Sequence, residues 1–159
     1  MSDETLSLPG LRNRLDKDDA CLECGFLLWE PIAVSAHSRL GLYNDDRFPG
    51  RCILALHGHY ASLDALPPEV LIGFMSDVQT AIRAIQIATG AARVNTAILG
   101  NRDPHVHAHL IPRYPEHEEF PDCSPWNDPR KKGKLGGLRA RSIKERILAC
   151  LIYGETPQQ

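Results

Sequence analysis

Three histidines alternate with apolar residues in the run His-Val-His-Ala-His-Leu-Ile, which spans residues 105–111. Because the side chains of a β-strand point alternately to its two faces, His105, His107 and His109 are predicted to share one face. The residues between them would face a core. Successive histidines would lie about 6.6–7 Å apart along the strand. Three imidazoles on one rigid strand indicate a reactive or metal-binding surface, with the middle ring accessible from a pocket.

The rest of the chain is typical of one soluble globular domain. It has 159 residues, of which 43% are hydrophobic and 24% are charged. Residues 130–146 carry eight basic side chains against one acid, Glu145. Such a segment is more often a solvated surface than a nucleotide-attracting one, and no specific nucleic-acid partner is predicted.

The N-terminal residues lack the pattern of a signal peptide, and no apolar run approaches membrane-spanning length. We therefore expect a cytoplasmic protein without a membrane partner. In that compartment the five cysteines are expected to be free or metal-bound rather than paired in disulfides.

Periodicity and turn residues predict the order of the elements. Pro67 and Pro68 begin a long helix with apolar residues at helical spacing, and Gly90 ends it. Ser142 and Glu145 match a capping box and predict a helix that starts there. Strands are predicted over 32–34, 39–43, 52–56 and 94–99, in addition to the histidine strand, with a turn-rich loop over 44–50. This order is typical of an α+β fold with a mostly antiparallel sheet.

The run 105–114, the hairpin over 44–59 and the helix over 67–90 together resemble the histidine triad (HIT) family. The resemblance covers roughly residues 21–114 and implies a HIT-like fold with one long helix and a C-terminal helix. It divides the chain into an N-terminal arm (1–20, with a short helix expected around 11–15), a HIT core (21–115) and a C-terminal extension (116–159) with the basic segment.

The resemblance implies a nucleotide hydrolase or transferase, similar to the diadenosine polyphosphate hydrolases, that acts at the α-phosphate of dinucleoside polyphosphates or adenylylated compounds. His107 would be the nucleophile and form a nucleotidyl-histidine, and His109 would donate to a phosphate oxygen or the leaving group. A neutral imidazole is nucleophilic near neutral pH, and a covalent intermediate divides one difficult displacement into two easier ones.

The second constellation is Cys21-x-x-Cys24, which alone fits half of a zinc site, a redox pair or coincidence. The family resemblance implies a structural zinc ion held by Cys21, Cys24, His59 and His105, a tetrahedral set without an open position. His57 lies two residues before His59 and competes with it as the third ligand.

Substrate contacts are expected in two loops, the turn-rich loop over 44–50 and the loop just before the histidine strand. Asn44, or alternatively Asp45, is the candidate for ribose recognition by resemblance, although Asn-Asp is also plain turn chemistry. The loop before the triad lacks the family's Gln and Ser, so Asn101 and Arg102 are the candidates for phosphate contacts. Trp126 is expected to stack on a base, on a partner subunit or on its own domain.

Two other functions compete with the hydrolase. One is a nucleotide-binding HIT protein with little turnover, which the shortened loop before the triad favours. The other is a metallohydrolase in which the triad, with Asp103, holds a catalytic metal. The resemblance also implies a homodimer.

Overall fold

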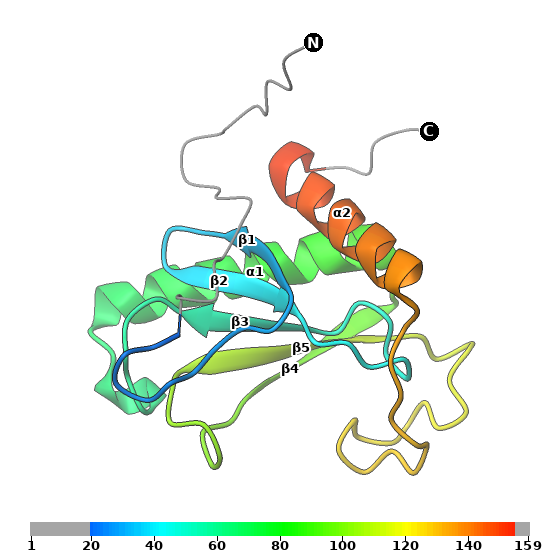
Figure 1. Ribbon diagram of the computed structural model, residues 1–159, viewed down its shortest axis with the longest axis horizontal. Helices are drawn as coiled ribbons and strands as arrows, with labels where there is room; N and C mark the ends of the chain where they lie inside the picture. Colours follow the sequence, from blue (N-terminus) through cyan, green and yellow to red (C-terminus); the bar gives the residue numbers. More distant parts are fainter. Residues whose placement is uncertain (1–19, 155–159) are drawn as a thin grey trace.

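The computed structural model describes residues 20–154, which form a five-stranded antiparallel sheet with two helices. The strands are β1 (Pro31–Val34), β2 (Ser38–Leu42), β3 (Cys52–Leu56), β4 (Arg93–Ile98) and β5 (His107–Arg113). Their order across the sheet is β1-β2-β3-β5-β4, so the histidine strand is an inner strand (Figure 1). The predicted α+β fold with an antiparallel sheet is confirmed. The short helix expected around 11–15 lies outside the described residues.

Helix α1 (Pro68–Thr89) begins with proline in its first turn and ends at Gly90, whose φ of 71° provides the left-handed C-cap. Between α1 and α2 the chain adds β4 and β5, which pair antiparallel along the whole length of β4. Leu63–Ala65 forms a short 3-10 helix before α1.

Helix α2 (Gly137–Tyr153) starts five residues before the predicted capping box, so that prediction is wrong. Ser142 lies inside the helix, and Glu145 accepts a hydrogen bond from Arg141 one turn earlier at 2.8 Å. The cause is tertiary packing, because the buried face of α2 runs through Ala140 and Ile143 and needs the extra N-terminal turn.

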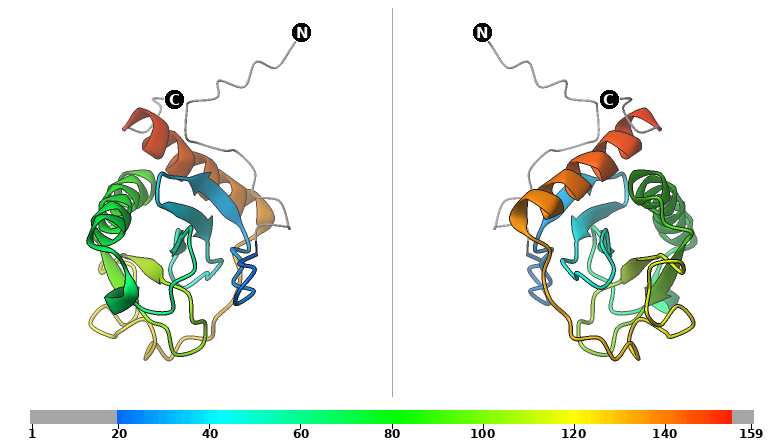
Figure 2. Two further views of the ribbon diagram at one scale, coloured as in Figure 1. Left: turned by 90° about the vertical axis from the view of Figure 1, so that its left-hand side faces the viewer. Right: turned by 90° about the vertical axis from the view of Figure 1, so that its right-hand side faces the viewer.

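Both helices cover the same face of the curved sheet, whereas the loop after β5 lies on the other side (Figure 2). One core cluster joins them, because alternate residues of the inner strands meet the apolar faces of α1 and α2. Its most buried members include Leu40, Leu54, Phe74, Ile85, Leu110 and Ile147. The C-terminal extension therefore shares the core of the HIT region.

Helix α1 is long and apolar enough to cross a membrane by length and composition, contrary to the expectation that no apolar run approaches that length. Its buried side chains, among them Phe74, Val78 and Ile85, belong to the core cluster described above. Packing on the sheet therefore explains the part of the apolar composition that is buried.

Candidate active site and metal site

The three histidines line the sheet face opposite the helices, but their surroundings differ. His105 lies just before β5 and is fully buried, and His107 is only 4% exposed. The ring of Phe26 stacks on His105 with centroids 4.9 Å apart and lies 5.0 Å from the ring of His107. The expectation that the middle histidine is accessible from a pocket is therefore wrong, because a segment far earlier in the chain covers it.

Hydrogen bonds fix the rings of His105 and His107 in opposite orientations. Nε2–H of His105 donates to the carbonyl of Leu56 at 2.8 Å, and Nδ1–H of His107 donates to the carbonyl of His105 at 2.6 Å. A carbonyl can only accept, so these nitrogens carry the protons. In the neutral rings, Nδ1 of His105 and Nε2 of His107 therefore keep free lone pairs.

Nδ1 of His105 points into a cluster with Cys21, Cys24 and His59, whose ligating atoms all lie within 4.8 Å of one another. The Sγ of Cys24 is 3.6 Å from Nδ1 of His105, and the Sγ of Cys21 is 3.5 Å from Nδ1 of His59. A tetrahedral zinc ion with sulfur and nitrogen ligands separates such atoms by about 3.6 Å. The four residues thus fit a zinc ion, with Leu56 orienting His105 from behind.

Three segments supply this cluster. The Cys21–Cys24 turn closes with a hydrogen bond from the amide of Gly25 to the carbonyl of Cys21 at 2.7 Å. His59 follows β3 and His105 precedes β5. The structure also separates the two competing histidines, because Nε2 of His57 lies 2.8 Å from the carbonyl oxygen of Ser35 and outside the cluster.

The two thiols of the cluster differ in acidity. Burial acts to raise the pKa of Cys21, but backbone hydrogen bonds from Cys24 and Glu23 bring it down to about 6. Burial raises the pKa of Cys24, and its contact with the Cys21 sulfur adds to this. The pair therefore favours one thiolate, and a bound cation would stabilise both.

His109 is in edge contact with His107, with centroids 5.0 Å apart, and with Trp126 at 5.6 Å. Burial, followed by the charges of His107 and Arg51, lowers the pKa of His109 to about 4. Its Nδ1 is buried without a hydrogen-bond partner. At neutral pH this ring is uncharged, and one of its ring nitrogens carries an N–H that can donate.

Beside His109 lies a cationic and aromatic cluster, of which the sequence had singled out only Trp126. The guanidinium of Arg51 lies over Tyr43, 4.2 Å from the ring centroid, and 5.8 Å from the centroid of Trp126. Lys132 donates to the hydroxyl of Tyr43. Arg51 directly follows the Pro49-Gly50 turn. Its place after this turn, at the start of the strand that pairs with the histidine strand, is the only sequence signal that pointed to Arg51.

Asp45 is not available for ribose. Its carboxylate is 0% exposed and accepts from Arg47 at 2.8 Å and from Arg51 at 2.8 Å. Burial acts to raise its pKa, but the hydrogen bond and charge of Arg47, with the charge of Arg51, lower it below the usual range. The ribose prediction for Asp45 is therefore wrong, and this residue holds Arg51 in place.

Asn44 is also engaged within the protein. Its amide nitrogen donates to Glu30 at 3.4 Å, and its carbonyl oxygen accepts from the amide of Leu135 at 2.8 Å. In this structure the side chain of Asn44 therefore holds the chain around Leu135 and is not free to contact a ribose. Asn101 and Arg102 lie exposed in the loop between β4 and β5.

No family model matches the sequence, and no curated protein matches it significantly. Several solved structures match the fold. A histidine triad protein from Sinorhizobium meliloti is 24% identical with a TM-score of 0.68, over 76% of this chain and 87% of that one.

Two other solved structures are informative by their names. A zinc-bound histidine triad family protein from Mycobacterium smegmatis is 20% identical with a TM-score of 0.54, over 77% of this chain and 83% of that one. A hypothetical histidine triad nucleotide-binding protein from Sulfolobus tokodaii is 14% identical with a TM-score of 0.61, over 79% and 85%. The chain therefore has the fold of the histidine triad proteins, as its sequence pattern predicted.

Proposed function

We propose that this protein is a nucleotide hydrolase or transferase that cleaves at the α-phosphate of dinucleoside polyphosphates or adenylylated compounds. The observation that carries the proposal is the orientation of His107. Because its Nδ1–H donates to the carbonyl of His105, Nε2 is left as a lone-pair nucleophile. The likeness to a nucleotide-binding protein of the same fold supports the choice of substrate class.

In the proposed reaction, Nε2 of His107 attacks the α-phosphorus. An N–P bond forms, and the P–O bond to the leaving group breaks with its electron pair. The leaving oxygen takes a proton from solvent, and water then cleaves the N–P bond and releases a nucleoside monophosphate. Neutral His109 would donate a hydrogen bond to a phosphate oxygen, and Arg51, whose charge acts on the His109 ring, would add positive charge beside it.

Substrate entry requires the Phe26 ring to move off His107, since that ring and the neighbouring histidines leave His107 4% exposed. Trp126 is 49% exposed at the edge of His109 and is proposed to stack on a base once the nucleotide is bound.

Zinc is proposed as a structural ion at Cys21, Cys24, His59 and His105. Bound there, it would tie the segment that carries Phe26 to the start of β5. The only metal-capable cluster among the described residues contains His105 and excludes His107 and His109. This separation favours the nucleotidyl-histidine route over a catalytic metal on the triad.

A homodimer is proposed through β4 and α1. Strand β4 is an edge of the sheet, and edges present unpaired backbone groups. Helix α1 exposes Ile72, Met75 and Ile87, which lie within about 120° of one another around the helix axis.

The function is tested by incubating the protein with a panel of adenylylated and guanylylated compounds and resolving the products by mass. Wild type should release a nucleoside monophosphate, and His107→Asn should reduce turnover by at least about 10³-fold. Tight nucleotide binding by wild type with no product would favour a binding protein, and full activity in His107→Asn would remove His107 as nucleophile.

A further inference from the structure

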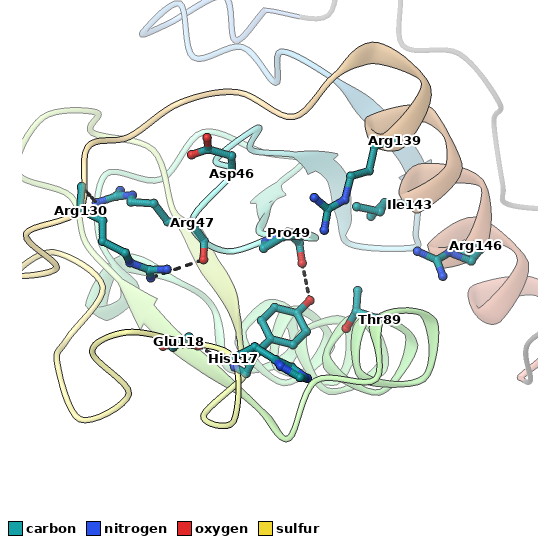
Figure 3. Close-up of a pocket in the computed structure, with 11 residues that line it drawn as sticks. Asp46, Arg47, Pro49, Thr89, His117, Glu118, Arg130, Arg139, Ile143 and Arg146 are labelled. Carbon is teal, nitrogen blue, oxygen red and sulfur yellow. Dashed lines mark hydrogen bonds between the residues drawn. The ribbon is translucent and has the colours of Figure 1, made fainter.

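A second concave site lies at the far end of β5. It is a cavity of about 350 Å³ formed by the 46–49 loop, the end of α1, the turn after β5 and one side of α2 (Figure 3). Tyr114, in its lining, is seven residues beyond His107, which at about 3.3 Å per residue places it about 23 Å away. The cavity shares no residue with the triad cluster. The charged residues in the lining are Asp46, Arg47, Glu118, Arg130, Arg139 and Arg146.

Half of the charged side chains that line the cavity are already compensated by ion pairs. Glu118 is buried and forms an ion pair with Arg113, with an N–O distance of 2.7 Å. Arg47 is paired with buried Asp45, and Arg130 is paired with buried Asp128 at 2.6 Å. These pairs form rigid walls with little net charge.

Arg139 and Arg146 differ, because within residues 20–154 neither has a carboxylate partner. The other two basic residues of α2 are paired. Arg141 contacts Glu145 at 2.8 Å, and Lys144 lies 4.0 Å from Glu30. The uncompensated cations of α2 are thus the two that line the cavity.

The helix geometry directs both cations to the same place. Arg139 and Arg146 are seven residues apart, which is about two turns or 10.5 Å along one face, with Ile143 between them. Both side chains extend from α2 toward the cavity beside Thr89 (Figure 3). Their positive charge reaches Tyr114, whose hydroxyl donates to the carbonyl of Pro49. The carboxylate of Asp46 is the one acid of the lining without an ion pair in the described chain, and its Oδ1 accepts from the amide of Gly133 at 2.8 Å.

We infer that this cavity binds a small anion that carries more than one phosphate charge, at a site separate from the triad. Guanidinium groups suit phosphate oxygens because they offer planar pairs of donors. The volume lies at the lower end of the range of small-molecule pockets, about 300–1,000 Å³, which favours a compact pyrophosphate-like ligand over a nucleic-acid backbone.

The probe is inorganic pyrophosphate, titrated into the full-length protein by calorimetry and by NMR of the arginine Nε–H groups. In wild type the Nε–H signals of Arg139 and Arg146 should shift. The double variant R139Q/R146Q should lose at least about tenfold in affinity for this site. The matched control R141Q, on the same helix but paired with Glu145, should bind like wild type.

The variant His107→Asn separates this site from the triad, because pyrophosphate should still shift Arg139 and Arg146 in it. Arginine signals that do not move in wild type would overturn the inference, as would equal weakening by R141Q and the double variant. Binding of a single-stranded oligonucleotide at these arginines in preference to pyrophosphate would also overturn it. Unchanged thermal unfolding of R139Q/R146Q shows that a loss of binding is not a loss of fold, and the NMR arm on wild type stands without the variant.

Discussion

At the scale of single residues, His105 and His107 differ in which ring nitrogen donates a hydrogen bond, and this leaves a different nitrogen free on each ring. His105 donates through Nε2 and presents Nδ1 to two cysteines, whereas His107 donates through Nδ1 and keeps Nε2 free. Both acceptors are backbone carbonyls, so the arrangement is fixed by the strand and not by mobile side chains. A two-residue spacing therefore suits the two rings to the proposed roles of metal ligand and nucleophile.

His109 makes stability depend on pH. Its pKa of about 4 in the folded protein lies below the ordinary value of about 6.5, because burial and nearby positive charge disfavour the protonated ring. Between these pH values the unfolded chain binds the proton and the folded chain does not. This contribution to the free energy of unfolding is therefore complete above about pH 6.5 and is lost as the pH falls towards 4.

Replacing His109 with Gln should flatten the pH dependence of stability in that interval. Urea unfolding at a series of pH values measures it, and His117→Gln, at an exposed histidine, serves as the control. Parallel curves for wild type and His109→Gln would contradict the assigned cause.

At the scale of elements, the Cys21–Cys24 turn should be the part of the structure most sensitive to metal. Its two cysteines meet His59 and His105 in the proposed metal site, and Phe26, two residues after the turn, lies against the ring of His107. Without a cation, the negative charge of one cysteine sulfur opposes ionisation of the other. The segment before β1 would then no longer be held to β5 by a metal ion.

Chelation of the metal should therefore lower the melting temperature by at least several degrees and raise the accessibility of His107. Calorimetry and histidine modification follow the two effects, and Cys24→Ser should reproduce both, whereas Cys123→Ser should change neither. Metal analysis that finds no zinc in protein purified without chelators would contradict the site.

The elements differ in how far the sequence predicts them. The histidine strand, the return strand over 52–56 and helix α1 are predicted well because period-two or helical patterns coincide with proline and glycine at their ends. The start of α2 is missed because Ser142 and Glu145 form a local capping signal that packing on α1 and the sheet overrides. Local signals are weaker than burial of a whole helix face.

The same contrast holds for the site. The four metal-capable residues are predicted as a set, because the Cys-x-x-Cys spacing and the family resemblance agree. The sequence does not predict that Phe26 covers His107, nor that Asp45 forms an ion pair with Arg51. Both depend on how distant segments meet across the sheet, which no local pattern reports.

At the scale of the whole molecule, the sheet separates two faces with different tasks. One face holds the helices and the apolar core (Figures 1 and 2). The histidines alternate with core residues along β5 and therefore lie on the other face. The proposed dimer would extend the sheet at β4 without covering either face.

Light scattering should therefore give a mass of about twice the 17.7 kDa chain. The double variant Ile72→Asp/Ile87→Asp should be monomeric, because a buried charge opposes association. Leu138→Asp, at a residue of α2 that is 88% exposed, should remain dimeric. A monomeric wild type at micromolar concentration would contradict the assembly.

The most direct test of the whole account is to look for the bond between protein and nucleotide. Wild-type protein mixed with an adenylylated substrate, quenched with denaturant at neutral or basic pH within the first turnovers, is analysed by intact mass spectrometry. The account predicts a species heavier by one nucleoside monophosphate less water, located on His107 and absent from His107→Asn. Product release with no such species, or a nucleotide attached to another residue, would contradict it.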